Sequence, residues 1–328
     1  MDRKLLSNSE ALVALVIVVI SAMISIRNSA FLSLGNLFDI LRSSIVMGVF
    51  GAGCLLVMIS GGTDVSFTTI AAFSMYSAVK ILIESGFTGS ILVAFVLSAA
   101  IGTALGLING LFVSLFNLPT IIVTLGTSAM FRGFLLTFIG SSAYYSLPER
   151  IGIVQFSRAN LAEVTTQSGL VFTLPASVLI LAGVFLAVWA ILKYTLLGRG
   201  IYAIGGNKTA AERIGFRVRP IQFFVYGFMG FCAGIAGMVQ CSMIRSANPV
   251  DLMGMELNVI AAVVLGGTSI SGGTGTPLGM ILGVLLVVII SNSLVLAGIP
   301  SYWQKVVLGL LIIIGTSVTA YRSSRELR

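Results

Sequence analysis

Residues 90–116 of the chain read SILVAFVLSAAIGTALGLINGLFVSLF and contain no charged side chain. A transmembrane helix needs about 20 consecutive apolar residues, so this stretch is long enough to cross a lipid bilayer. The whole 328-residue chain has the same character, because 57% of it is hydrophobic and only 9% is charged, whereas soluble domains carry roughly 25% charged residues. The sequence therefore predicts a protein embedded in the membrane and excludes a soluble enzyme with an anchor.

Further apolar stretches predict an all-α membrane protein, a polytopic bundle of about ten transmembrane helices in a single domain over 1–328. The N-terminal run, which ends near residue 26, lacks a signal-peptide cleavage site and is expected to be retained as the first span. Glycine-rich breaks at 60–66 and 266–276 are expected to be broken or re-entrant segments. The other spans are expected at 37–59, 67–84, 90–116, 119–140, 170–194, 221–243, 257–270, 276–297 and 302–320.

The distribution of basic residues predicts the orientation, because Lys and Arg in short loops stay on the cytoplasmic side. The segment 196–220 holds five basic residues against one acid, and the C-terminal tail is also basic. We therefore expect both termini and this loop to be cytoplasmic, with six spans before the loop and four after it. The segment 141–169, whose charges balance, then becomes the longest external loop. The net charge of +8 follows from these loops and does not indicate a nucleic-acid partner.

Composition and motifs exclude several kinds of chemistry. The chain has no histidine, the commonest metal ligand and general base, so we predict no metal site and no catalytic residue. Cys54, Cys232 and Cys241 stand apart in apolar stretches and are expected to be small buried hydrophobic residues. The phosphate-binding pattern GxxxxGK[ST] is absent, so the chain is expected to bind no nucleotide cofactor. Energy for transport must then come from an ion gradient or from another subunit.

Two sequence echoes favour an internal repeat, as found in many transporters. GGTDVS at 61–66 resembles GGTSIS at 266–271, and each string follows one apolar stretch and precedes another. The pattern GxxxGxxxG occurs at Gly102, Gly106 and Gly110 and again at Gly275, Gly279 and Gly283. This spacing places small residues on one helix face, where two backbones can approach closely. Chance and tight helix packing remain alternative explanations.

Polar residues at membrane depth are candidates for a translocation path. Asp64 and Ser66 lie in a glycine-flanked break, where they either contact a polar solute or cap the helix that follows. Arg132 either pairs with Glu256 or extends to the headgroups. Neutral polar groups favour neutral polar cargo over an ion, although such groups also bind helices to each other. The remaining path candidates are Asn109, Asn117, Thr124, Glu256 and Asn258.

The basic loop contains a run that reads as a short helix, from Asn207 to a terminating glycine at Gly215. A charged helix outside the bilayer is typical of a docking site for a soluble partner. A solvated loop with no partner is the alternative. The residues that we expect to carry docking are Gly205, Gly206, Asn207, Ala210, Ala211, Glu212 and Gly215.

Four blocks resemble the permease subunits of bacterial sugar-type ABC importers, the ribose, arabinose, galactose and autoinducer-2 group. They are GGTDVS (61–66), GLINGLFVSLFNLPTIIVTLGTSAMFRG (106–133), GRGIYAIGGNKTAAERIGFRV (198–218) and GMELNVIAAVVLGGTSISGGTGTPLG (254–279). The resemblance implies about ten helices in the inner membrane, a second permease chain, two cytoplasmic ATPase domains that use ATP, and a periplasmic sugar-binding protein. It also implies that the loop at Gly205–Gly215 is the coupling helix that seats on the ATPase.

One position departs from this resemblance. Relatives usually read GIDLSVG where this chain reads GTDVSFT at 62–68, so Asp64 and Ser66 are kept but Thr68 replaces a glycine. The resemblance therefore does not identify the cargo beyond a monosaccharide or similar small polyol. An ion-coupled secondary transporter and a membrane scaffold without transport activity are the alternative functions. Whether the second permease chain is identical is left open, and surrounding membrane lipid is the remaining expected partner.

Overall fold

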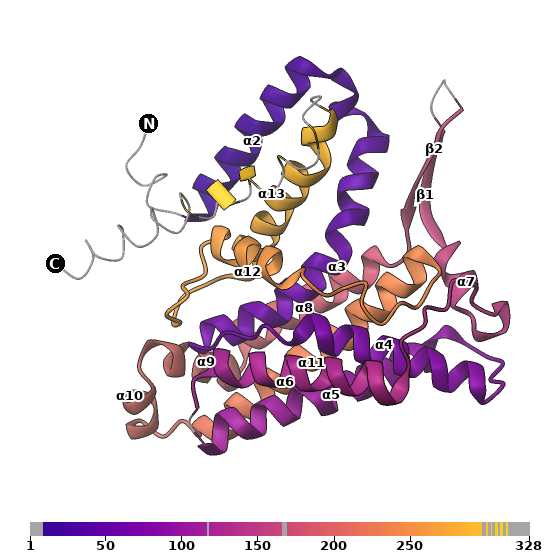
Figure 1. Cartoon of the computed structure of the whole chain (residues 1–328). Helices are drawn as coiled ribbons and strands as arrows, with labels where there is room; N and C mark the ends of the chain where they lie inside the picture. Colours follow the sequence, from indigo (N-terminus) through magenta and orange to yellow (C-terminus); the bar gives the residue numbers. More distant parts are fainter. Residues whose placement is uncertain are drawn as a thin grey trace.

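The computed structural model of the chain describes residues 9–116, 118–165 and 169–296, together with residues 300, 303, 306, 307, 309, 310 and 313. This part of the chain is helical except for loops and one β-hairpin (Figure 1). The longer helices are α2 (Ser9–Arg27), α3 (Leu34–Ile59), α4 (Phe67–Glu84), α5 (Ile91–Phe116), α6 (Thr120–Phe134), α8 (Val178–Tyr194), α9 (Leu196–Gly206), α11 (Val218–Ile244), α12 (Glu256–Leu265) and α13 (Pro277–Leu296). The short elements are η1 (Ser29–Leu32), η2 (Leu135–Ile139), η3 (Glu149–Ile151), α7 (Ile153–Ser157), β1 (Asn160–Thr165), β2 (Val171–Pro175) and α10 (Lys208–Arg213).

Six helical segments in these ranges are long and apolar enough to cross a membrane, and a seventh is added if α8 and α9 act as one span bent by 77°. The six are Glu10–Arg27, Leu34–Ile59, Phe67–Glu84, Ile91–Phe116, Thr120–Ile139 and Val218–Ile244. Large apolar side chains such as Val18 (63% exposed), Met23 (64%) and Ile122 (63%) lie on the outer surface, as lipid-facing residues do. The predicted polytopic helical membrane protein is confirmed.

The count of ten spans is not confirmed by the described residues. The span expected at 257–270 is the helix α12, which ends at Leu265 because Gly266 and the left-handed Gly267 (φ 94°) begin a turn. At 10 residues α12 is too short to cross a bilayer. The described apolar part of α13, Pro277–Asn292, is also below the length of a full span. The last predicted span, 302–320, lies almost entirely outside the described residues.

The described part of the segment 141–169 contains regular secondary structure, whereas the sequence predicted a long external loop. After η3 and α7, the strand β1 pairs with β2 in an antiparallel hairpin, with Ala162 opposite Leu174 and Val164 opposite Phe172. The span expected at 170–194 is therefore wrong at its start, because residues 171–175 form β2 and α8 begins only at Val178. In Figure 1 the hairpin and α7 lie at one end of the molecule, and α10 lies at the other.

The centre of the fold is the contact between α5 and α11, the most extensive helix pair in the described chain. A methyl group added to Gly102 would lie 2.4 Å from the Gly230 carbonyl oxygen, and one added to Gly106 would lie 2.3 Å from the Tyr226 carbonyl oxygen. Only glycine allows this approach. The predicted glycine face of residues 102–110 is confirmed.

The prediction that the second GxxxGxxxG pattern lies on one helix face is wrong for one of its three glycines. Gly275 precedes α13 and adopts φ 152°, so only Gly279 and Gly283 lie on the helix. There they pack against Gly266 and Ala262 of the α12 segment. The pattern therefore describes two helix contacts and one loop position.

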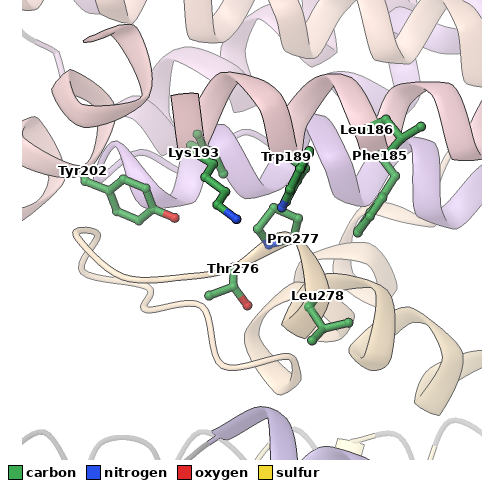
Figure 2. Close-up of a pocket in the computed structure, with 9 residues that line it drawn as sticks. Phe185, Leu186, Trp189, Lys193, Tyr202, Thr276, Pro277 and Leu278 are labelled. Atoms are coloured by element: carbon green, nitrogen blue, oxygen red, sulfur yellow. The ribbon is translucent and has the colours of Figure 1, made fainter. Parts of the chain in front are cut away.

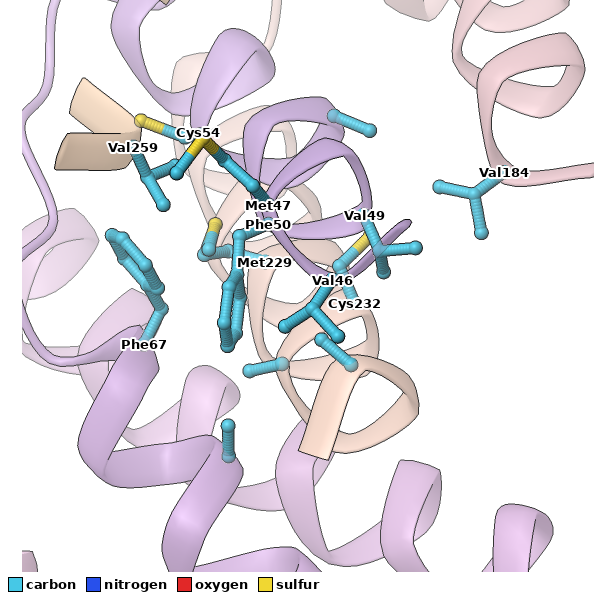
Figure 3. Packing of buried hydrophobic residues seen from close by; sticks show 14 of the residues in the cluster. Val46, Met47, Val49, Phe50, Cys54, Phe67, Val184, Met229, Cys232 and Val259 are labelled. Atoms are coloured by element: carbon cyan, nitrogen blue, oxygen red, sulfur yellow. The ribbon is translucent and has the colours of Figure 1, made fainter. Parts of the chain in front are cut away.

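The buried apolar core joins α3, α4 and α11 (Figure 3). The rings of Phe50 and Phe67 lie 5.0 Å apart, and Met229 and Cys232 of α11 fill the space beside them. The three cysteines are free and buried, as predicted. This core holds the end of α3 and the start of α4 in place, and the first glycine-rich break lies between them.

Candidate functional site

The first glycine-rich break, residues 60–66, connects α3 to α4 through a turn and irregular backbone. Gly61 turns the chain with φ 83° directly after Ser60, the C-cap of α3, and the amides of Gly61 and Gly62 still donate to the carbonyls of Met58 and Val57. Inside a bilayer the amides of such a segment need protein partners. The Thr63 amide donates to Thr120 Oγ1 at 2.9 Å, and the Val65 amide donates to Thr124 Oγ1 at 3.3 Å. Two threonines one turn apart on α6 thus replace the missing helical hydrogen bonds.

Asp64, Ser66 and Asn109 form a buried hydrogen-bonded cluster in this break. Asp64 Oδ1 accepts from the Ser66 amide and from the Ser66 hydroxyl, both at 2.7 Å, and Asn109 Nδ2 donates to Ser66 Oγ at 2.7 Å. The three residues are at most 1% exposed. The carboxylate binds the amide of Ser66, the residue before α4 begins, so it orders the entry to the helix. Thr124 is also buried and binds the same break from α6.

A separate polar cavity of about 780 Å³ lies where the start of α4, α6 and the start of α12 meet. Thr68 Oγ1 donates to Glu256 Oε2 at 2.9 Å, and the Gly254 amide donates to the same oxygen at 2.9 Å. Across the cavity, Thr69 and Ser128 share a hydrogen bond of 2.8 Å between their hydroxyls. The Arg132 side chain lines the cavity, but in the described residues it forms no ion pair with Glu256.

The site residues predicted from the sequence are therefore divided between two places. Asp64 and Ser66 lie in the buried break and Asn109 and Thr124 bind it from α5 and α6, whereas Glu256 lines the cavity. Asn258 is exposed and is not among the residues lining the cavity, and Asn117 lies outside the described residues. Sequence reasoning did not select Thr69 and Ser128. A signal was present, because Thr124, Ser128 and Arg132 are spaced by four residues and so share one face of α6.

The predicted short helix of the basic loop is confirmed as α10. Asn207 caps it, accepting from the Ala210 amide at 2.9 Å, and Gly215 ends the segment with φ 98°. Ala211 is 2% exposed, while Ala210 and Glu212 face outward. The preceding helix α9 was not predicted, because its four glycines conceal it; its signal is Thr195, whose hydroxyl caps the Gly198 amide at 3.0 Å.

The end of α9 touches both glycine-rich breaks. A methyl group on Gly205 would lie 1.7 Å from the Ile59 carbonyl oxygen, and the Gly273 amide donates to that same oxygen at 2.9 Å. Gly272 in turn approaches the backbone of Gly61 and Gly205. The backbones of three segments therefore meet with no side chain between them, directly before α10. We call this contact of Ile59, Gly61, Gly205, Gly272 and Gly273 the glycine joint.

Comparison with known proteins identifies the family. Residues 36–315 match the family described as branched-chain amino acid transport system/permease component. The chain is 33% identical to the ribose import permease of Escherichia coli over 95% of its length and 94% of that protein. It is 35% identical to the ribose import permease of Bacillus subtilis, over 92% of the chain and 89% of that protein. It is 33% identical to the D-allose transport system permease of Escherichia coli, over 88% of the chain and 84% of that protein.

No solved structure shows significant similarity to the chain. The match to the family covers most of the sequence, and the similar permeases align over nearly their full lengths. The absence of a nucleotide-binding pattern in the sequence agrees with a transport subunit that has no ATPase site of its own. The chain belongs to this permease family and is the multi-pass transmembrane subunit of a bacterial ABC importer.

Proposed function

We propose that this chain imports a monosaccharide or similar small polyol across the bacterial inner membrane. The names of the similar permeases, for ribose and D-allose, support a sugar cargo. In this proposal a second permease chain completes the pathway, two cytoplasmic ATPase domains bind and use ATP, and a periplasmic binding protein delivers the solute. The chain itself binds no nucleotide.

The observation that carries the proposal is the composition of the cavity of about 780 Å³. Sugar hydroxyls both donate and accept hydrogen bonds, so a path for them requires scattered groups of both kinds. Thr68, Thr69 and Ser128 supply hydroxyls, Glu256 supplies an acceptor and Arg132 supplies donors. A proton or ion pathway instead needs ionisable groups in series. Asp64, Ser66 and Asn109 support this path by holding the break beside it.

The glycine joint provides a route by which a movement of the ATPase domains reaches the transmembrane helices. In alternating access, ATP binding draws the ATPase domains together and displaces α10, which docks on them. Because Gly205 contacts the backbone beside both breaks, a displacement of α9 and α10 reaches α4 through the first break and α13 through the second. Rigid backbone contacts transmit such a shift better than long side chains. Gly206, Asn207, Ala210, Ala211, Glu212 and Gly215 are proposed to form the docking surface together with Gly205.

The proposal includes the orientation and the remaining spans. The termini and the loop at 196–220 face the cytoplasm, and the hairpin segment faces outward, as the positive-inside distribution favours. α12 and α13 enter the membrane around the second break, and the last span expected from the sequence, 302–320, lies almost entirely outside the described residues. The whole chain of about ten spans is one permease domain.

The test uses the chain reconstituted in vesicles with its cognate ATPase and binding protein. With ATP inside the compartment that holds the ATPase domains, D-ribose or D-allose should accumulate against a gradient, and dissipation of ion gradients should not stop it. Accumulation without ATP or without the ATPase would overturn the proposal. Accumulation of an amino acid and of neither sugar would overturn the cargo assignment while leaving the ABC mechanism in place.

A further inference from the structure

A second cavity, of about 550 Å³, lies far from the polar one, between the last turns of α8, α9 and the start of α13. Figure 2 shows Phe185 and Trp189 of α8 on the side of Pro277 and Leu278, and Leu186 also lines the cavity. Its walls are apolar, and Leu192 completes them. The polar groups lie together at one end, where Lys193 and Tyr202 reach toward Thr276 (Figure 2).

The positively charged group at the polar end of the cavity is Lys193. Its ammonium nitrogen lies 5.0 Å from the centre of the Trp189 ring and 5.4 Å from that of Tyr194. In the described residues no ion pair engages it. The Tyr202 hydroxyl donates to the Gly275 carbonyl at 2.7 Å, and the Thr276 hydroxyl donates to the carboxylate of Glu10. Lys193 thus places a positive charge at the mouth of an apolar cavity, while the Glu10 carboxylate at the same end is engaged by Thr276.

The residues around Lys193 are of the kinds that concentrate where a bilayer meets water. Trp and Tyr concentrate at the headgroup level, and lysines near helix ends extend toward it. Trp189, Lys193 and Tyr194 occupy the last two turns of α8, and there the chain bends by 77° into α9. The basic loop at 196–220 follows at once. An apolar cavity with its cation at the headgroup level therefore opens on the side that carries the positive charge.

We propose that this cavity binds an anionic phospholipid. One acyl chain lies along Phe185, Leu186 and Leu278, and the phosphate contacts the Lys193 ammonium. The apolar wall packs against the hydrocarbon chain, and the ammonium group contacts the negatively charged phosphate. Basic pockets between transmembrane helices bind anionic headgroups through the same complementarity. A zwitterionic lipid fits the wall but lacks net charge for Lys193. The lipid then connects α8 to α13 across the cavity. This inference is independent of the cargo.

The two tryptophans of the chain, Trp189 and Trp303, allow a direct test. A Trp303→Phe background leaves Trp189 as the single tryptophan reporter. The full permease chain in this background, purified without its ATPase and binding protein, is placed in vesicles of phosphatidylcholine containing a small fraction of phosphatidylglycerol, with bromine on the acyl chains of one or the other lipid. Bromine quenches tryptophan on contact, so the measurement compares how each lipid populates the cavity.

The expected result is stronger quenching of Trp189 by brominated phosphatidylglycerol than by brominated phosphatidylcholine at equal fraction, decreasing at high salt. Lys193→Gln should lower the apparent preference about fivefold, the fold-change for one basic residue near an anionic surface. Lys193→Arg should retain it. Arg219→Gln removes a charge from the same basic loop outside the cavity and should leave the preference unchanged.

Equal quenching by both lipids in the parent protein would overturn the proposal, as would a preference that Lys193→Gln leaves intact. Absence of quenching by either lipid would show that another part of the protein covers the cavity and would also overturn it. Elution of each variant as an intact complex, with sugar uptake comparable to the parent, verifies that folding is retained.

Discussion

The two glycine-rich breaks begin with similar strings, GGTDVS and GGTSIS, but they are held in place by different means. The first is largely buried, and side chains from α6 and its own Asp64 bind its amides. The second is less buried and turns through four glycines of positive φ, at residues 267, 272, 273 and 275. A side-chain network holds the first break, whereas the second depends on conformations that only glycine adopts readily. Similar sequences therefore produce one break that side chains hold and one that glycine backbone shapes.

The largest effect is expected where the two breaks meet. Gly205→Ala places a methyl group 1.7 Å from the Ile59 carbonyl oxygen, so the glycine joint has to separate. Overpacking of this kind costs about 1–3 kcal/mol, and because it falls on the proposed coupling route we expect uptake to decrease at least about tenfold. Sugar uptake in reconstituted vesicles and ATP hydrolysis should be measured together.

Gly183→Ala in the adjacent helix α8 is the matched control, because nothing lies within 4 Å of a methyl group at that position and the residue is outside the proposed docking surface. It should retain near-normal uptake. Equal losses in the two variants would mean that the effect does not arise at the glycine joint, which would then lose its assigned role.

The next effect, measured as a loss of stability, is expected from removing the side chains that hold each break. Asp64→Ala leaves the buried Ser66 amide and hydroxyl without their acceptor and should lower the free energy of unfolding by about 3 kcal/mol. Ser269 in the second break accepts only the exposed Ser271 amide, at 3.2 Å, so Ser269→Ala should cost less than about 0.5 kcal/mol. Unfolding in mixed micelles measures both. Similar costs in the two variants would remove the distinction between the breaks.

The smallest effect on stability, but a clear one on transport, is expected at Glu256. This residue begins α12, which leads to the second break, and binds Thr68, which follows the first. Glu256→Gln keeps the shape and one acceptor oxygen but removes the charge, so we expect the initial rate of sugar uptake to fall about fivefold with little change in stability. Asn258→Ala, at an exposed position not lining the cavity, should leave the rate unchanged. If Asn258→Ala slowed sugar uptake more than Glu256→Gln, the cavity would not be part of the translocation path.

Several features could be read directly from the residues. The membrane class, the helices α3 to α6, the glycine face at Gly102 and Gly106, and the helix α10 all depend on local composition or on spacing along one helix. The cavity could not be found in this way, because Thr68, Ser128 and Glu256 lie in three segments far apart in the sequence. The hairpin was missed because β2 is apolar and adjoins an apolar helix, so strand and helix share one hydrophobic run.

Membrane insertion, helical character and membership of the family follow from hydropathy and motif order, which are properties of short stretches summed along the chain. The roles of the polar residues do not. Asp64 lies within the first glycine-rich break and Glu256 begins the helix that leads to the second, yet one carboxylate is enclosed by its own break and the other faces a cavity. This difference arises because burial depends on which distant helices pack against a residue, and those neighbours exist only after the chain has folded.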